Sequence, residues 1–488
     1  MIFGIDLGSS SSCISYLINN KPEPVIDQTS GYSIPSTVML SKNGEFFVGL
    51  HATRHRNRYD SINLTVRSIK RKLQRHQTIP FGSAHYPAIL FYALILAELK
   101  LIGEGKLKVE ISRAVISVPA NFGIVQRQAV NDAALIAGIQ PLRIINEAIS
   151  TALDYSYHHG RGADHSLVVY DIGAGSLDVA AIKVGSGVIE VINVDGDEFL
   201  GGEDFDELIV NKLINHCKKI NGFDPLDDQL AVNRGMALNR LYEAAENAKR
   251  ELSDNEVVEI KIPFMRSILG KRQDLEMCLT RREFEGVSAP LLKRCIKPLE
   301  SIKDQKLFKD NPRLLVTGGM ARVPMIRNEL IKWGKNNIVF RNKNVVANGA
   351  AIQCGVLHGT IKDLLLLDVF PKDLRLVISD TSAEVLIQKN TTTPTKKSKI
   401  LTTTRDDQTS VSIRMQEGNF TDPSNNVTVA EVILNGVPRA KAGIPQIRVS
   451  FDIDANAKVN EPLSTIEDTF KISFISHSDR NKIILTLY

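Results

Sequence analysis

The stretch Val168–Val179, VVYDIGAGSLDV, joins two apolar runs through Asp171 and a turn of small residues. This order predicts a strand, a tight turn and a second strand. Glycines in such a turn let backbone N–H groups face outward toward an anion. An aspartate at its mouth can hold a hydrated divalent cation.

The N-terminus repeats the pattern in residues 2–12, IFGIDLGSSSS, with Asp6 in the place of Asp171. Two such turns predict related halves that face one phosphate group from opposite sides. The alternative is two unrelated β-hairpins with buried aspartates.

Length and composition narrow the class of protein. A chain of 488 residues is too long for one ordinary core, so we expect two to four domains. A net charge of +5 is small for this size and gives no reason to expect nucleic acid as the main partner. The five cysteines form no CxxC pair, which argues against a disulfide framework and a zinc site and for a reducing compartment. Because we find neither a secretory signal nor an 18-residue apolar span, we expect a cytoplasmic protein without a membrane partner.

The first three quarters of the chain mix strands with helices, which predicts an α/β architecture with mixed sheets. Strands are expected at 13–18, 37–40, 45–48, 113–118, 143–145, 188–194, 257–263 and 314–317. Helices are expected at 63–75, 86–102, 126–137, 149–157, 205–220, 233–252, 280–303, 325–335 and 345–357. Gly138 marks a helix end, and Thr280 with Glu283 has the spacing of a capping box.

The pattern changes near residues 362–369, where an apolar run carries an aspartate near each end. Short alternating strands follow, which predict an all-β sandwich. They are expected at 374–378, 384–387, 399–404, 410–416, 427–434, 446–453, 469–474 and 482–487. We therefore expect an α/β domain at 1–362, a linker at 363–368 and a β-sandwich domain at 369–488.

Three glycine-rich turns, 8–11, 173–176 and 318–322, follow predicted strands and can each present N–H groups to phosphate. The region has neither the P-loop motif nor the dinucleotide fingerprint in a βαβ setting. Taken alone, Lys70 would be a surface residue and Glu147 a charge at a helix N-terminus.

Segments along nearly the whole chain resemble, in order, those of the 70-kDa heat-shock (DnaK-type) chaperone family, in a short form. The matching segments are GIDLGSS (4–10), IKR (69–71), VISVPANF (115–122), RIINE (143–147), YDIG (170–173), FLGGEDFD (199–206), ENAKRELS (246–253), GG (318–319) with Arg322 and Pro324, LLLLDV (364–369), KNTT (389–392), PTK (394–396) and GIPQI (443–447).

The resemblance implies an actin-like ATPase domain whose two lobes enclose a nucleotide cleft, and a role in protein folding and the stress response. It implies that Lys70 positions the γ-phosphate and the attacking water, that Glu147 orients this water or its proton acceptor, and that Ser176 lies near the γ-phosphate. Asp6 and Asp171 would hold Mg²⁺ mostly through water, and K⁺ is a further expected ion. Positioning and charge stabilisation dominate catalysis of phosphoryl transfer to water.

The resemblance also implies the residues that bind ATP or ADP. They are Gly8, Ser9, Ser10, Ser11, Gly173, Ala174, Gly175, Gly202, Glu246, Lys249, Arg250, Ser253, Gly318, Gly319, Met320 and Arg322. The four from 246 to 253 recur at i, i+3, i+4 and i+7 and so share one helix face, which the resemblance places against adenine and ribose.

Further residues are implied to couple the two domains. Pro119 resembles the family's switch proline, Arg127 its relay partner, and Arg143 and Asn146 match positions that receive the linker and a J-domain co-chaperone. In the linker, Leu365, Leu366 and Asp368 are read as part of a strand that adds to a sheet edge. The alternative is a permanently buried strand.

In the sandwich, the resemblance implies a pocket for one apolar side chain of an extended client peptide. Its residues are Leu376, Leu401, Val411 and Ile413, and Thr404 belongs to an arch over the peptide. The alternative is that these alternating apolar residues fill the sandwich core.

The sequence departs from the family pattern at several places. Ala174 stands where the second turn has glycine, which is tolerated if φ stays negative. Ser379 and Thr404 predict a weak arch. The segment 75–115 is short, so one subdomain of the first lobe is expected to be smaller than in the family. This weakens the expectation of family-type contacts with a large nucleotide exchange factor. The chain ends at Tyr488 without a helical lid, so we expect weak peptide binding and fast release.

The favoured function is an ATP-driven chaperone that binds extended apolar segments of unfolded proteins. The first alternative is a small-molecule kinase, since the actin-like scaffold serves many reactions. The second is a nucleotide-regulated binding module with negligible turnover.

Overall fold

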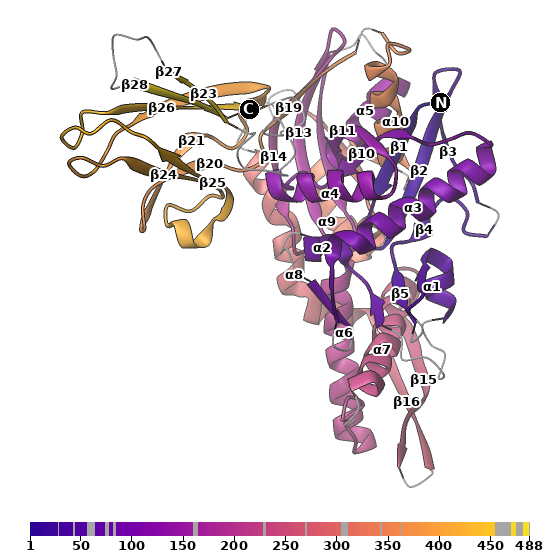
Figure 1. The fold of residues 1–488 in the computed structure, drawn as a ribbon. Helices are drawn as coiled ribbons and strands as arrows, with labels where there is room; N and C mark the ends of the chain where they lie inside the picture. Colours follow the sequence, from indigo (N-terminus) through magenta and orange to yellow (C-terminus); the bar gives the residue numbers. More distant parts are fainter. Residues whose placement is uncertain are drawn as a thin grey trace. The chain divides into compact units, whose positions relative to one another are not determined.

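The computed structural model describes residues 1–27, 29–41, 44–55, 64–73, 78–81, 84–159, 164–227, 231–268, 271–303, 311–341, 344–362, 364–453, 470–474 and 482–487. The chain divides into two compact units. The first comprises Met1–Ala120, Val130–Gly187 and Asp195–Leu364, and the second Asn121–Ala129, Val188–Val194 and Leu365–Tyr488. Figure 1 shows the fold.

The first sheet of unit 1 holds the N-terminal turn. Strand β1 runs antiparallel to β2 and parallel to β10, so Asp6 lies between Cys13 and Ser117 on the neighbouring strands. In order, the sheet contains β11 (Gln140–Asn146), β10 (Arg113–Val118), β1 (Phe3–Leu7), β2 (Ser11–Ile18) and β3 (Lys21–Pro24), with β4 (Ile34–Pro35) paired to β2.

The second sheet carries the second turn. Strand β12 (His165–Ile172) is antiparallel to β13 (Leu177–Gly185), and Asp171 lies opposite Asp178. On its other side β12 is parallel to β17 (Arg313–Thr317), which is parallel to β18 (Ile338–Phe340). The strand, turn and strand predicted for residues 168–179 are therefore confirmed.

One helix packs closely against the first sheet and joins it to a second helix. Helix α10 (Val345–Leu357) contacts β1 and α5 (Glu147–His159) (Figure 1). Glycines allow this approach, since a β-carbon on Gly4 would lie 2.1 Å from the backbone nitrogen of Ala351. The sheet is thus fixed to α5, whose first residue is Glu147.

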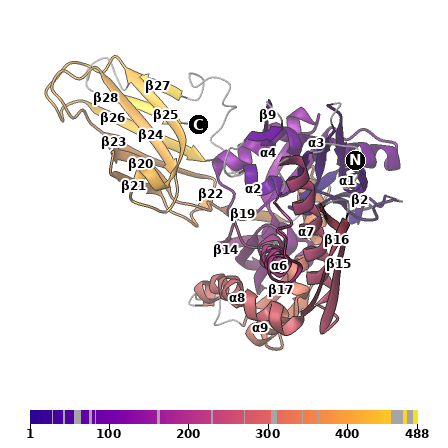
Figure 2. The same ribbon diagram turned by 90° about the horizontal axis from the view of Figure 1, so that it is seen from below.

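Unit 1 also contains a long hairpin, β15 (Val257–Ile268) with β16 (Lys271–Thr280), which lies beside α7 (Ala231–Glu251) (Figures 1 and 2). Strand β16 was not predicted because charged residues separate its few apolar ones. The capping box before α8 (Arg281–Lys303) is confirmed, since Thr280 and Glu283 exchange side-chain to backbone hydrogen bonds of 3.0 and 3.2 Å.

Several of the remaining elements follow the predictions with small shifts in bounds. They are β5 (Val38–Leu40), β6 (Phe46–Val48), α3 (Ala88–Leu107), α4 (Ile124–Ile136), α6 (Gly202–His216) and α9 (Pro324–Gly334). The elements that were not predicted are α1 (Gly49–His55), β8 (Thr78–Phe81), β9 (Ala84–Pro87), the π-helical turn η1 (Cys217–Asn221) and the 3-10 turn η3 (Gly319–Arg322). The predicted hairpin of β5 and β6 is confirmed, although residue 43 of its turn lies outside the described residues. Gly138 ends α4 with a φ of 71°.

The helix predicted for residues 63–75 is wrong over most of its length. Leu64–Val66 forms β7, which pairs with β5, and α2 spans only Ile69–Leu73. β-branched residues in this stretch favour a strand, and Ser68 adopts a φ of 54° that a continuous helix does not allow. Residues 63, 74 and 75 lie outside the described residues.

The sandwich forms most of unit 2. The first sheet contains, in spatial order, β21 (Ser382–Ile387), β20 (Leu374–Ser379), β24 (Ser410–Glu417) and β25 (Val427–Asn435). The second contains, in spatial order, β23 (Thr395–Leu401), β26 (Gln446–Ile453), β28 (Lys482–Leu487) and β27 (Phe470–Phe474). Between them lies one cluster of buried apolar side chains. A short 3-10 turn, η4 (Pro423–Asn425), precedes β25.

The linker run forms a strand in unit 2. Strand β19 (Leu365–Val369) pairs in parallel with the start of β14 (Val188–Asp197) and antiparallel with β22 (Thr392–Thr393). The run is thus a paired strand, and its docking as a separable linker remains a prediction. The domain boundaries at 362 and 368 remain a prediction. Within the described residues, no helix is both long enough and apolar enough to span a membrane.

Candidate functional site

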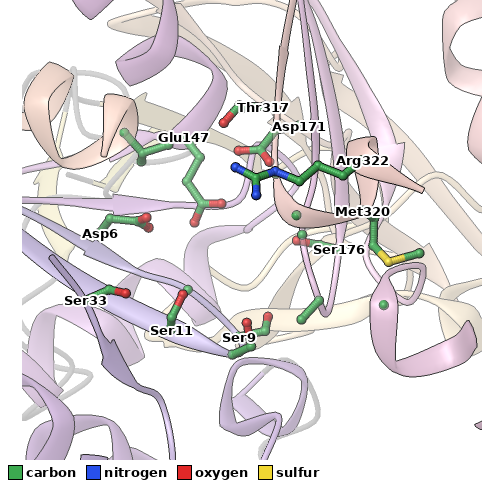
Figure 3. Close-up of a pocket in the computed structure, with 18 of the residues that line it drawn as sticks. Asp6, Ser9, Ser11, Ser33, Glu147, Asp171, Ser176, Thr317, Met320 and Arg322 are labelled. Carbon is green, nitrogen blue, oxygen red and sulfur yellow. The ribbon is translucent and has the colours of Figure 1, made fainter. Parts of the chain in front are cut away.

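A pocket of about 500 Å³ opens in unit 1, within the range of roughly 300–1,000 Å³ common for small-molecule sites. All the predicted catalytic, metal-binding and nucleotide-binding residues line it except Gly175. In Figure 3, Asp6, Ser9, Ser11 and Glu147 lie on one side, and Asp171 with Arg322 lies on the other. The structure therefore brings together residues up to about three hundred positions apart in the chain.

The two phosphate-turn candidates touch each other. A β-carbon on Gly175 would lie 2.3 Å from Ser9 Oγ. Gly173 closes its turn by donating its N–H to the carbonyl of Ser176 at 3.0 Å. Ala174 does not adopt a positive φ, as its methyl group requires. The glycine that the packing needs is therefore at 175 and not at 174.

The third turn approaches the second equally closely. Gly318 has a φ of 87°, and a β-carbon there would lie 2.1 Å from the carbonyl oxygen of Ile172. It would also lie 2.7 Å from Asp171 Oδ1. Any side chain at 318 would therefore displace the carboxylate at the mouth of the second turn.

A buried ion pair lies inside the pocket. Lys70 on α2 donates a hydrogen bond to Glu147 at the start of α5, and the lysine side chain is 4% exposed. Burial alone would lower the pKa of Lys70, but the charges of Glu147, Tyr92 and Asp6 raise it above its usual value. Lys70 therefore remains a cation throughout the physiological pH range.

Three aspartates crowd the same space. Burial, followed by the charge of Glu147, raises the pKa of Asp6 to about 7, and the same two causes raise the pKa of Asp178 to about 7. Burial and the charges of Glu147, Asp178 and Asp6 also raise the pKa of Asp171. Lys70 opposes each shift. Such a set is stabilised by a cation placed among the carboxylates. In the described residues, no three acidic, histidine or cysteine side chains gather as direct metal ligands. Carboxylate oxygens also bind the waters of a hydrated divalent cation, and the chemistry of this set fits such an ion.

Helix α7 supplies another wall of the pocket. Lys249, buried, donates to the carbonyl of Gly202 at 2.8 Å and lies 2.7 Å from Asp206. Glu246 pairs with Arg250 at 2.6 Å, and Ser253 follows the end of the helix. The four residues predicted to share a face all line the pocket.

A family model described as "Hsp70 protein" matches residues 2–89 and 80–461. The chaperone protein DnaK of Thermosipho melanesiensis is 38% identical over 499 aligned positions, which cover 99% of this chain and 82% of that protein. The chain belongs to the Hsp70 family. Its fold is that of the family, a mixed α/β nucleotide-binding region followed by mostly antiparallel β-sheets. Members of the family are ATPases that bind ATP or ADP with Mg²⁺.

Some pocket residues of this Hsp70 were not singled out from the sequence. Asp178, Ser33 and Thr317 line the pocket. Asp178 lies in the opening stretch and faces Asp171 across the hairpin, so its position after the turn was an available signal. Thr317 directly precedes Gly318 of the third turn, so its position was also an available signal. Ser33 carried no such signal, because nothing in its local sequence relates it to the other pocket residues.

The residues expected to couple the domains of this Hsp70 lie close to these turns or are buried. Asp178 Oδ1 accepts the N–H of Ala120, directly after Pro119, at 2.7 Å. Arg127 is buried, and its Nε donates to the carbonyl of Phe122 at 2.9 Å. Arg143 and Asn146 are also buried. Their roles remain predictions.

The predicted peptide residues divide into three groups. Leu376 and Ile413 belong to the buried core of the sandwich, and Leu401 and Val411 pack against it while partly buried. Thr404 is exposed. A peptide pocket at these residues remains a prediction.

Proposed function

We propose that this Hsp70 is an ATP-dependent chaperone that binds extended apolar peptide segments of unfolded proteins and couples ATP hydrolysis to its affinity for them. The observation that carries the proposal is one pocket in which two apposed glycine turns, a buried lysine–glutamate pair and a group of aspartates converge. It is supported by 38% identity to a DnaK chaperone over nearly the whole chain.

The side chains suit the transfer of a phosphoryl group to water. Lys70 Nζ donates hydrogen bonds to the γ-phosphate and holds the attacking water in line. Glu147, bonded to Lys70, accepts a hydrogen bond from that water and so orients it. Ser176 and the backbone N–H groups of the turns stabilise charge on the phosphate oxygens. Asp6 and Asp171 would hold Mg²⁺ through water, and this ion would neutralise phosphate charge.

Gly175→Ala is expected to slow single-turnover ATP hydrolysis about tenfold to a hundredfold, the scale of a small misplacement of reacting groups. The new methyl group meets Ser9, so the two turns must separate. Stopped reactions analysed for released phosphate measure the rate. Ser9→Gly in the same protein removes both colliding atoms and is expected to restore part of the activity. A wild-type rate in Gly175→Ala would mean that the turns do not touch.

Coupling between the domains is proposed to run through β19. Of its two leucines predicted to act in coupling, Leu366 is 7% exposed and Leu365 is 55% exposed. Leu366 therefore contributes the apolar burial that holds the strand, and a charge there is costly. We place the ATPase domain at 1–362, the linker at 363–368 and the peptide-binding domain at 369–488.

Leu366→Asp is expected to abolish the effect of ATP on peptide affinity. In the wild type, fluorescence anisotropy of a labelled apolar peptide is expected to show affinity at least about tenfold lower with ATP than with ADP, a coupling within the usual allosteric range. Leu365→Asp places the same charge at the exposed leucine and is expected to leave this difference intact. Failure of apolar peptides to bind in either state would overturn the proposed function.

A nucleotide-regulated binding module with negligible turnover is the second candidate, favoured by the polar residues Ser379 and Thr404 at the proposed arch. Measurable hydrolysis in the wild type excludes it. We also propose a J-domain co-chaperone that docks near Arg143 and Asn146, and action in the cytoplasm.

A further inference from the structure

The short helix α2 carries two neighbouring basic residues, Lys70 and Arg71, whose side chains contact different parts of unit 1. Lys70 donates to Glu147 inside the pocket. The next residue, Arg71, donates its Nε to the carbonyl of Gly175 at 2.8 Å, and its two terminal nitrogens to the carboxylate of Asp204 at 3.1 and 2.6 Å. One helix thus carries the proposed catalytic lysine and a contact to the second phosphate turn.

Asp204 belongs to a rigid piece that includes that turn. It caps α6 by accepting the N–H of Gly201 at 2.7 Å. The first N–H groups of α6 do not point to solvent, because those of Gly202 and Glu203 donate to the carbonyls of Gly173 and Ala174 at 3.1 and 2.9 Å. The turn and the N-terminus of α6 are therefore hydrogen-bonded to each other, and Arg71 is hydrogen-bonded to both.

The contact has the geometry of a strong ion pair. Two parallel hydrogen bonds from a guanidinium to a carboxylate are stronger and more directional than a single charged contact. The side chains of Arg71 and Asp204 are 18% and 19% exposed. Burial would lower the pKa of Arg71, but the hydrogen bond and charge of Asp204, with the charge of Glu203, raise it. On the other side of α6, Lys249 holds Gly202 and Asp206.

We propose that Arg71 and Asp204 form a clamp that positions Lys70 against the second phosphate turn during hydrolysis. Neither residue lines the pocket, so both act as positioning residues. The proposal rests on the proposed function. Because contacts to the nucleotide come from other residues, loss of the clamp should affect the hydrolysis step more than ATP affinity.

The test measures single-turnover hydrolysis and ATP affinity separately in the full chain. Arg71→Ala and Asp204→Asn are each expected to slow hydrolysis about tenfold or more, while the dissociation constant for ATP changes by less than about threefold, well below the cost of a lost charged contact. The double variant is expected to be no slower than the slower single variant, because both changes break the same contact between the guanidinium and the carboxylate.

A matched control is the exposed pair of Lys212 and Glu283, which joins α6 to α8 at 3.2 Å. Lys212→Ala is expected to leave both quantities unchanged. If Arg71→Ala does not fold, as judged by circular dichroism, Arg71→Lys takes its place. Lysine keeps the positive charge but cannot donate two parallel hydrogen bonds to the carboxylate. The same slowing of hydrolysis is therefore expected. The clamp would be overturned if the Arg71 and Asp204 variants hydrolysed ATP at the wild-type rate, or if they lost ATP affinity as much as rate. It would also be overturned if the slowing in the double variant were the product of the slowing in the two single variants. Absence of hydrolysis in the wild type would instead overturn the proposed function.

Discussion

Lys70→Ala is expected to slow single-turnover ATP hydrolysis by about a hundredfold to a thousandfold, the cost of removing one preorganised donor from a buried site. Lys70 is buried, stays cationic and is held by Glu147, so its orientation is fixed before any substrate binds. ATP should still bind, because three turns and one face of α7 also line the pocket. Phosphate release in single-turnover reactions and equilibrium ATP binding measure the two effects.

Two controls separate catalysis from folding. Removing Lys70 leaves Glu147 buried without its lysine, which costs about 3–5 kcal/mol in comparable pairs. Glu147→Gln in the same protein removes that charge and is expected to recover stability but not hydrolysis. Lys72→Ala changes a lysine on the same helix that does not line the pocket and is expected to keep the wild-type rate. Near wild-type hydrolysis by Lys70→Ala would contradict the assigned role.

Gly349→Ala is expected to lower the free energy of unfolding by about 3 kcal/mol, the upper end for an overpacked core. Helix propensity alone predicts the opposite, since alanine is favoured over glycine by about 1 kcal/mol within a helix. The steric effect wins because a β-carbon at 349 would lie 1.8 Å from the backbone oxygen of Ser150 on α5. A backbone carbonyl cannot rotate away as a side chain can, so α5 and α10 must separate.

Denaturant unfolding followed by circular dichroism measures this loss. Gly105→Ala on α3 is the matched control, because nothing lies within 4 Å of a β-carbon there. That variant is expected to gain up to about 1 kcal/mol from helix propensity. A Gly349→Ala protein as stable as the wild type would mean that α5 and α10 do not pack at this distance.

Local patterns in the sequence were sufficient for most of the fold. Apolar runs interrupted by Asp6 and Asp171 predicted both strand–turn–strand units, and the predicted strand 113–118 coincides with β10. The predicted helix 345–357 coincides with α10. These elements were predictable because their burial is visible in the apolar periodicity of each segment. The family resemblance then identified pocket residues, such as Lys70, that periodicity alone assigned to the surface.

What the sequence did not predict depends on contacts between distant segments. The strand at Leu64–Val66 is paired by β5, a contact that a local helical pattern does not reveal. Leu365 and Leu366 point to opposite faces of β19, and which face is covered depends on the segments that pack against it. The ion pair of Arg71 and Asp204 joins residues 133 positions apart. Such contacts require the fold to be known first.

The central claim is that hydrolysis in the pocket and peptide binding in the sandwich are coupled. Single-turnover ATP hydrolysis, measured with and without a short apolar peptide on wild type and Leu366→Asp, tests it most directly. The account predicts that peptide speeds hydrolysis in the wild type and has no effect in Leu366→Asp. Hydrolysis that proceeds at the same rate with and without a peptide known to bind the wild type would contradict the account.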